Sequence, residues 1–248
     1  MIRLLKYDWK RNGRAVLALI TVLVLLQGVM LTLNSLGYWK DEVTLVLSMV
    51  AYAMTGVILQ IIVFKTFDHN IRSYSRRLLP VPVSSGMIST VVQSWMALIF
   101  IVLLISAHIL VLWSENWRAF MQVGVLHWLD WTLMILALLW QFTSFVVTVL
   151  FCVTVARVFS AKGGLWLGIA LSIAIPSVVS WLGDRIEGEP NAWTNKIFVL
   201  QIGVQESAAS PVRPITEIPW GPLLLELIVV AVLVYFTKKL IERKVEVS

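Results

Sequence analysis

The sequence predicts an all-α integral membrane protein with six transmembrane helices, an N-terminal interfacial helix and a cytoplasmic amphipathic helix. Apolar residues make up 59% of the 248 residues and charged residues only 14%, whereas a soluble domain carries about a quarter charged residues. The charged residues also gather between long apolar runs. We therefore expect one transmembrane domain that covers residues 1–248.

Six apolar runs have about the length, roughly 20 residues, that a helix needs to cross the hydrocarbon core. They cover residues 15–36, 43–64, 86–113, 127–151, 163–182 and 220–236. The first run lacks the short hydrophobic region and small-residue cleavage site of a signal peptide, so we interpret it as an uncleaved span. The fifth contains Pro176, which is expected to kink the helix or split it.

The basic residues predict the orientation in the membrane. Fifteen of the 20 Lys and Arg residues lie before span one, after spans two and four, or after span six, and five lie in the other connections. Because basic residues stay on the cytoplasmic side during insertion, both termini are predicted to be cytoplasmic in a multi-pass protein of the plasma membrane. This asymmetry also explains the net charge of +6, so we expect a lipid bilayer rather than nucleic acid as the partner of the basic residues.

The first 13 residues have helical spacing, with Ile2, Leu5 and Trp9 on one face and basic residues on the others. This pattern favours a short helix that lies on the inner leaflet. An ordinary basic flank of the first span is the alternative.

Residues 65–79 predict a second amphipathic helix. Apolar residues recur at spacings of three or four, and polar residues fill the remaining positions. The apolar positions are Phe64, Phe67, Ile71, Tyr74 and Leu78, and the polar ones include Lys65, Asp68, His69, Arg72, Ser75 and Arg76. Pro80 and Pro82 are expected to end the helix. Its apolar face either docks on a cytoplasmic partner or rests on lipid.

The outer segment, residues 183–219, is the longest connection. It begins acidic and then becomes apolar around residues 197–204. The apolar stretch predicts either a short helix that packs on or re-enters the outer membrane face, or a plain structured cap.

Ionisable residues inside spans usually serve a purpose, because they are costly there. The candidates are His108, His127, Asp130 and Glu226. His127 and Asp130 are too few for a zinc site, so we expect no metal. We interpret this pair as solvated polar residues near the outer interface, and His108 and Glu226 as hydrogen-bonding within the bundle, so we expect no catalytic residues. The sequence also contains no phosphate-binding Gly-x-x-x-x-Gly-Lys-Ser/Thr loop, and so the chain is not expected to hydrolyse ATP itself.

Small and amide side chains suggest how the spans pack. Gly164 and Gly168 form a Gly-x-x-x-Gly pattern, which allows close approach of helices. One glutamine falls in each of the first four spans. These amides either line a polar path or tie helices together, and we favour the second interpretation. They are Gln27, Gln60, Gln93 and Gln141.

This arrangement resembles the permeases of ABC type-2 exporters. The similarity includes the six spans, the basic N-terminal helix, the amphipathic helix after span two and the long outer segment before span six. The segment from Phe67 to Ser84, with a Leu-Pro turn after a charged helix, is similar to the cytoplasmic segment of that family. Pro82 and His69 have no clear counterpart in the family pattern.

The resemblance implies a function and a set of partners. Two cytoplasmic ABC ATPase subunits would bind ATP and Mg²⁺, and a second permease copy or a related chain would complete the pathway. The helix at residues 65–79 would be the coupling helix that docks on the ATPase. Its contact residues would be Phe67, Asp68, Ile71, Arg72, Tyr74, Arg76 and Arg77. Such exporters move peptides, antibiotics, lipids or glycopolymers outward, and the chain would itself bind no cofactor.

Two other functions remain open. The chain could be a membrane-embedded enzyme or proton-coupled carrier that uses His108, Glu226 or the His127 and Asp130 pair. It could also be a membrane scaffold or immunity protein that transports nothing. A partner ATPase would distinguish the exporter from both.

Overall fold

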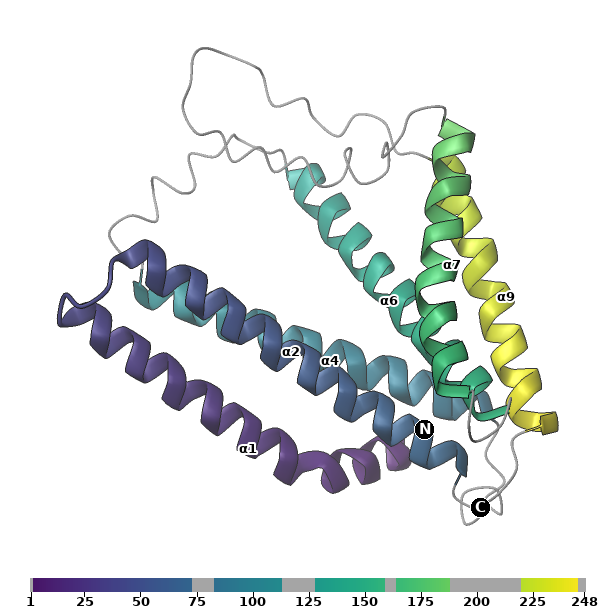
Figure 1. Cartoon of the computed structure of the whole chain (residues 1–248), viewed down its shortest axis with the longest axis horizontal. Coiled ribbons are helices and arrows are strands. Elements are labelled where there is room, and N and C mark those ends of the chain that lie inside the picture. Colours follow the sequence, from purple (N-terminus) through teal and green to yellow (C-terminus); the bar gives the residue numbers. More distant parts are fainter. Residues whose placement is uncertain (1, 73–82, 113–127, 159–163, 188–219, 245–248) are drawn as a thin grey trace. The chain divides into compact units, whose positions relative to one another are not determined.

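The computed structural model describes residues 2–72, 83–112, 128–158, 164–187 and 220–244. These residues form six helices in two units of three (Figure 1). Unit 1 contains α1 (Ile2–Ser35), α2 (Asp41–Arg72) and α4 (Val83–Leu112), and unit 2 contains α6 (Trp128–Val158), α7 (Gly164–Glu187) and α9 (Trp220–Lys244).

Five of these helices are long and apolar enough to cross a membrane. The qualifying stretches are Tyr7–Ser35, Val43–Ile71, Ser84–His108, Ile135–Val158 and Trp166–Ile186. The predicted all-helical, multi-pass membrane protein is therefore confirmed. The apolar run at residues 220–236 lies inside α9, which is not among the five, so the sixth span and the orientation of the termini stay predictions.

Many large apolar side chains on these helices are exposed, as expected of surfaces that face lipid. Leu17 and Leu25 on α1, Leu136 on α6 and Trp166 on α7 are each more than 60% exposed, at 65, 65, 66 and 73%. Such surfaces are unusual in a soluble monomer. They agree with helices that use the bilayer as their solvent.

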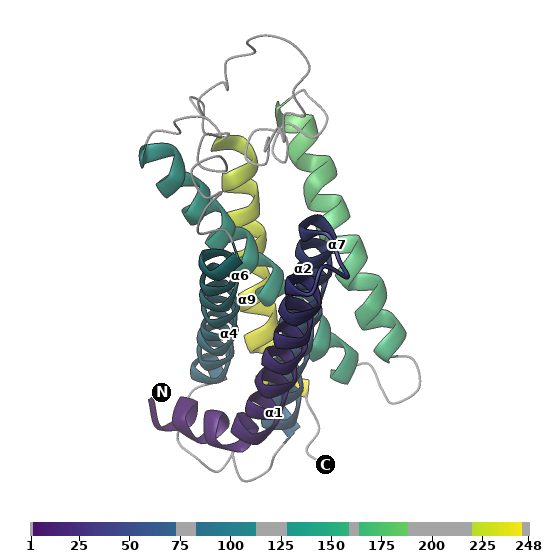
Figure 2. The same ribbon diagram turned by 90° about the vertical axis from the view of Figure 1, so that its left-hand side faces the viewer.

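The N-terminal interfacial helix is not a separate element. α1 runs without a break from Ile2 to Ser35 and so joins the predicted interfacial helix to the first span. Figure 2 shows that the first turns of α1 bend away from the direction of the rest of the helix. The first turns therefore belong to one continuous helix, and their placement on the inner leaflet stays a prediction.

The short connection between α1 and α2 is a glycine-capped turn. Gly37 has a φ of 77°, a left-handed conformation that glycine adopts without strain. Its amide donates to the Asn34 carbonyl at 2.9 Å, and the amide of Tyr38 donates to the carbonyl of Leu33 at 3.1 Å. This pair of bonds is a Schellman motif, which satisfies the last carbonyls of α1 and reverses the chain into α2.

α2 and α7 both extend beyond the boundaries that the sequence predicts. α2 continues past Phe64 to Arg72, so residues 65–72 are its last turns and not part of a separate helix; residues 73–79 lie outside the described chain. α7 includes Pro176 without a break, because a transmembrane helix tolerates the lost hydrogen bond when neighbouring groups replace it. α7 also takes in residues 183–187 of the predicted outer segment, and residues 188–219 lie outside the described chain.

Polar side chains connect the helices of unit 1. Ser48 of α2 donates to Oε1 of Gln27 on α1 at 2.9 Å, and both residues are buried. The side chain of Gln60 on α2 donates to the backbone carbonyl of Ser94 on α4 at 3.3 Å. Two of the four glutamines therefore tie helices together, which is the favoured interpretation of their spacing in the sequence.

Small residues bring the helices of unit 2 together. A Cβ atom added at Gly168 of α7 would lie 3.1 Å from the Cβ of Ala156 and 3.3 Å from the carbonyl oxygen of Cys152, both on α6. A Cβ added at Gly164 would overlap the carbonyl of Ala156. The Gly-x-x-x-Gly pattern therefore permits the close approach that the sequence predicts. Elsewhere on α6, Val146 and Leu150 are fully buried.

Candidate functional site

A group of five polar side chains joins the first turns of α1 to the last turns of α2. Asn12 donates to the hydroxyl of Thr66 at 2.6 Å. Asn70 donates to Oδ2 of Asp8 at 3.2 Å and accepts a hydrogen bond from Arg11 at 3.3 Å. We call these five residues, Asp8, Arg11, Asn12, Thr66 and Asn70, the α1–α2 latch.

Asp8 is the centre of the latch. Its side chain is only 2% exposed, and Arg11 lies one helical turn away with its Nη2 3.9 Å from Oδ1 of Asp8. A buried carboxylate is tolerated only where donors surround it, and here Asn70 and Arg11 are among them. Hydrogen bonds to charged groups contribute about 1.5–3 kcal/mol each, so the bond from Asn70 to Asp8 is expected to stabilise the N-terminal turns.

The structure places two of the predicted docking residues in the protein interior. Phe67 is 2% exposed and Ile71 is 8% exposed. Helical spacing shows that these side chains share a face but not what covers that face. They therefore offer no free apolar surface to an ATPase, contrary to the role that the resemblance gives them.

The other predicted docking residues are described only in part. Asp68 is half-buried, and only the backbone of Arg72 is described. Tyr74, Arg76 and Arg77 lie outside the described residues, so their docking role stays a prediction. Two neighbours on the last turns of α2, Lys65 and His69, are exposed.

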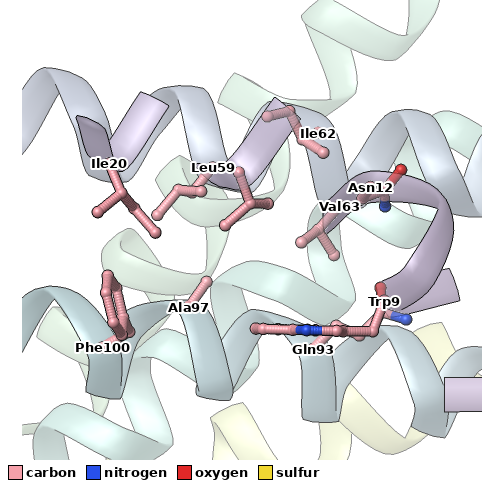
Figure 3. Close-up of a pocket in the computed structure, with 10 residues that line it drawn as sticks. Trp9, Asn12, Ile20, Leu59, Ile62, Val63, Gln93, Ala97 and Phe100 are labelled. Atoms are coloured by element: carbon pink, nitrogen blue, oxygen red, sulfur yellow. The ribbon is translucent and has the colours of Figure 1, made fainter. Parts of the chain in front are cut away.

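A cavity of about 70 Å³ lies between α1, α2 and α4 (Figure 3). Asn12 of the latch belongs to its wall, so the two features adjoin. The other lining residues are Trp9, Val16, Ile20, Leu59, Ile62, Val63, Gln93, Ala97 and Phe100. The cavity is mostly apolar, and its polar wall groups come from Trp9, Asn12 and Gln93.

The ionisable candidates within the helices have different surroundings. Glu226 of α9 is buried and accepts a hydrogen bond of 2.8 Å from the indole Nε1 of Trp140 on α6. His108 of α4 packs edge-on against Tyr52 of α2, with ring centroids 5.7 Å apart. Glu226 belongs to unit 2 and His108 to unit 1.

The structure does not describe the side chains of the predicted pair His127 and Asp130. His127 lies outside the described residues, and Asp130 is on α6 with its side chain undescribed. Within the described helices, no three His, Cys, Asp or Glu side chains lie close enough to hold a metal ion.

The latch was not predicted from the sequence, although a signal for it is present there. Asp8 and Asn12 are four residues apart on α1, and Thr66 and Asn70 are four residues apart on α2. In each helix such a pair lies on one face. Two short polar faces beside apolar spans could have been read as partners, but nothing in the sequence shows that they meet.

The fold and these contacts define a multi-pass helical membrane protein. Comparisons of the chain with protein-family models, curated proteins and solved structures found no match.

Proposed function

We propose that this protein is the transmembrane permease subunit of an ATP-driven exporter. Separate cytoplasmic ATPase subunits with ATP and Mg²⁺ would drive it, and a second permease copy or a related chain would complete the pathway. The substrate class would be a peptide, an antibiotic or a lipid.

The α1–α2 latch is the observation that carries this proposal. It bonds the basic N-terminal turns of α1 to the end of α2, directly before the basic segment that begins at Arg72. A permease without its own ATPase must receive motion from a partner at one end of its spans. The end of unit 1 that carries basic residues and the hydrogen bonds of the latch is suited to receiving motion from a partner.

The continuity of α2 is a second support. The helix runs unbroken from Asp41 to Arg72, so no loop separates the apolar span from the end that the latch holds. Movement applied just beyond Arg72 would therefore act on the span as on a rigid rod. The latch would carry the same movement to α1.

The burial of Phe67 and Ile71 changes which residues we expect at the ATPase contact. We assign the contact to exposed Lys65 and His69 and to the segment after Arg72. Within that segment Tyr74, Arg76 and Arg77 remain the proposed contacts.

Matched substitutions test this assignment. Tyr74→Asp should lower ATPase binding about 30-fold, because an interface hot spot contributes about 2 kcal/mol or more, and should leave the thermal stability unchanged. Ile71→Asp should instead destabilise the fold, because it places a charge in the interior. Binding would be measured by titrating the purified ATPase onto the chain in nanodiscs. Wild-type binding and turnover in Tyr74→Asp would contradict the docking assignment.

A proton-coupled carrier is the second candidate, and buried Glu226 is the observation that favours it. A carboxyl group inside a membrane bundle is by default a candidate proton site. Its hydrogen bond from Trp140 also suits a purely structural role. Replacement of Glu226 by Gln distinguishes these roles, as described in the Discussion.

A further inference from the structure

The cavity of unit 1 has a polar end and an apolar end. Figure 3 shows Trp9, Asn12 and Gln93 at one end and Ile20 and Phe100 at the other. The order along the helices agrees with the picture. Asn12 and Ile20 are about 12 Å apart along α1, and Gln93 and Phe100 about 10 Å apart along α4, at 1.5 Å per residue.

Gln93 is an unsatisfied donor in the wall of this cavity. The residue is only 5% exposed, and its amide nitrogen Nε2 has no hydrogen-bond partner among the residues that the structure describes. Buried amide groups in native proteins nearly always have a partner. A ligand that brings a carbonyl oxygen to Nε2 would supply one.

The cavity lies among helices whose natural solvent is lipid. All three of its helices contain candidate membrane spans, and half-exposed Trp9 stands at its polar end. Indole rings prefer the level of the lipid headgroups and ester bonds. The polar end therefore corresponds to the depth at which a bilayer lipid has its ester carbonyl, and the apolar end to the depth of its acyl chain.

The size of the cavity also favours a ligand over a single water molecule. A water needs about 10–15 Å³ of such volume and two or more polar partners. The cavity offers about 70 Å³ with a mostly apolar wall. Ile20, Leu59 and Phe100 would contact methylene groups well and water poorly.

We propose that unit 1 binds the ester-linked acyl chain of a bilayer lipid in this cavity. The ester carbonyl accepts a hydrogen bond from Nε2 of Gln93 beside Trp9, and the first part of the chain packs against Leu59, Ile20 and Phe100. The site goes beyond the proposed function and does not depend on it, because it needs only unit 1 in a bilayer.

The test uses the full chain in nanodiscs with photoactivatable phosphatidylcholine that carries a diazirine in one hydrocarbon chain. Two forms of the lipid are compared, one ester-linked and one ether-linked, since the ether form lacks the carbonyl. Crosslinked peptides are identified by mass spectrometry. We expect crosslinks at the peptides of Ile20, Leu59 and Phe100, and about three- to tenfold more from the ester form, the factor that one net hydrogen bond provides.

Three variants make the result specific. Gln93→Leu should remove the preference for the ester form, and Ala97→Phe should reduce the crosslinks at these peptides by filling the cavity. Val24→Phe is the matched control, because Val24 is exposed on the lipid-facing surface of α1, and it should behave as the wild type. Gln93→Leu nearly conserves volume and so tests the hydrogen bond even if Ala97→Phe folds poorly.

Equal labelling by the two lipids in the wild-type protein would overturn the proposal, because Gln93 would then bind no carbonyl. Crosslinks confined to lipid-facing residues such as Val24 and Leu25 would overturn it as well. Neither result would bear on the exporter function, which is tested through the ATPase.

Discussion

The helices within unit 1 and the helices within unit 2 are held together by different kinds of interaction. In unit 1 polar side chains bond across the helices, from Gln27 and Ser48 near one end to the α1–α2 latch at the other. In unit 2 glycines allow backbones to touch, with Gly164 and Gly168 of α7 against α6. A hydrogen bond from Trp140 to Glu226 adds a polar contact there.

The difference matters because these interactions respond differently to movement. Close backbone packing depends on shape and is lost when helices shift by a fraction of an ångström. Side-chain hydrogen bonds can break and re-form, and those between helices in a membrane contribute on average only about 0.6 kcal/mol each. The hydrogen bond from Asn70 to the charged Asp8 in the latch is expected to contribute more. Unit 1, with its latch and cavity, is therefore better suited to receive movement or a ligand, and unit 2 to remain rigid.

The largest expected effect is in unit 2. Gly164→Leu should destabilise the protein by about 3 kcal/mol or more, because a side chain there overlaps the backbone of Ala156 and overpacking typically costs 1–3 kcal/mol even where atoms can yield. Thermal unfolding in detergent measures the loss. Gly28→Leu on α1 is the control, since a Cβ atom at Gly28 meets nothing within 4 Å. Equal unfolding temperatures for the two variants would show that close packing does not hold unit 2.

The next effect is in the latch of unit 1. Asp8→Ala removes the buried carboxylate that Asn70 and Arg11 contact, and should weaken the attachment of the N-terminal turns by about 1–3 kcal/mol. Hydrogen exchange in residues 2–13 should speed up, with little change elsewhere.

The exposed neighbour Lys10 supplies the control for the latch. Lys10→Ala removes a charge from the same turn but should leave exchange at the wild-type rate. Unchanged exchange in Asp8→Ala would mean that the latch does not hold the N-terminal turns.

A smaller effect separates the exporter from the proton-coupled carrier. Glu226→Gln keeps an oxygen that can accept the indole hydrogen bond but removes the ionisable group. The exporter proposal predicts transport within about twofold of the wild type and a stability loss of about 1 kcal/mol or less. Complete loss of transport in a variant that folds normally would favour the carrier. Trp140→Phe, which removes the donor and keeps the carboxyl group, is the matched variant.

The smallest effect comes from the hydrogen bond between Gln27 and Ser48. A double-mutant cycle with Gln27→Leu and Ser48→Ala should give a coupling energy of about 0.6 kcal/mol. Unfolding in mixed micelles would measure it. A coupling of zero would mean that the polar bonds of unit 1 do not stabilise it, which would remove the contrast with unit 2.

The helices could be predicted from the sequence because lipid exposure requires long apolar runs. Each predicted span lies almost entirely within one helix, and the contact made by Gly164 and Gly168 was predicted as well. Helix ends were less accurate, because residues 65–72 are polar enough to resemble a new element. In the structure α2 continues through residues 65–72, where Thr66 and Asn70 form hydrogen bonds to α1.

The candidate site was harder to predict because periodicity does not identify neighbours. Phe67 and Ile71 have the spacing of a docking face and are buried. Gln93 resembles the other span glutamines in sequence, and only its surroundings distinguish it from Gln27 and Gln60. Contacts between helices far apart in the chain decide these cases.

The most direct test of the exporter proposal is co-purification of the full chain from its native membrane in a mild detergent. Mass spectrometry would identify the partners, and the chain carrying Tyr74→Asp would be purified in parallel. The proposal predicts a soluble ATPase with a phosphate-binding loop at about one copy per chain, and its loss from the variant. A wild-type chain that purifies without any such ATPase would contradict the proposal.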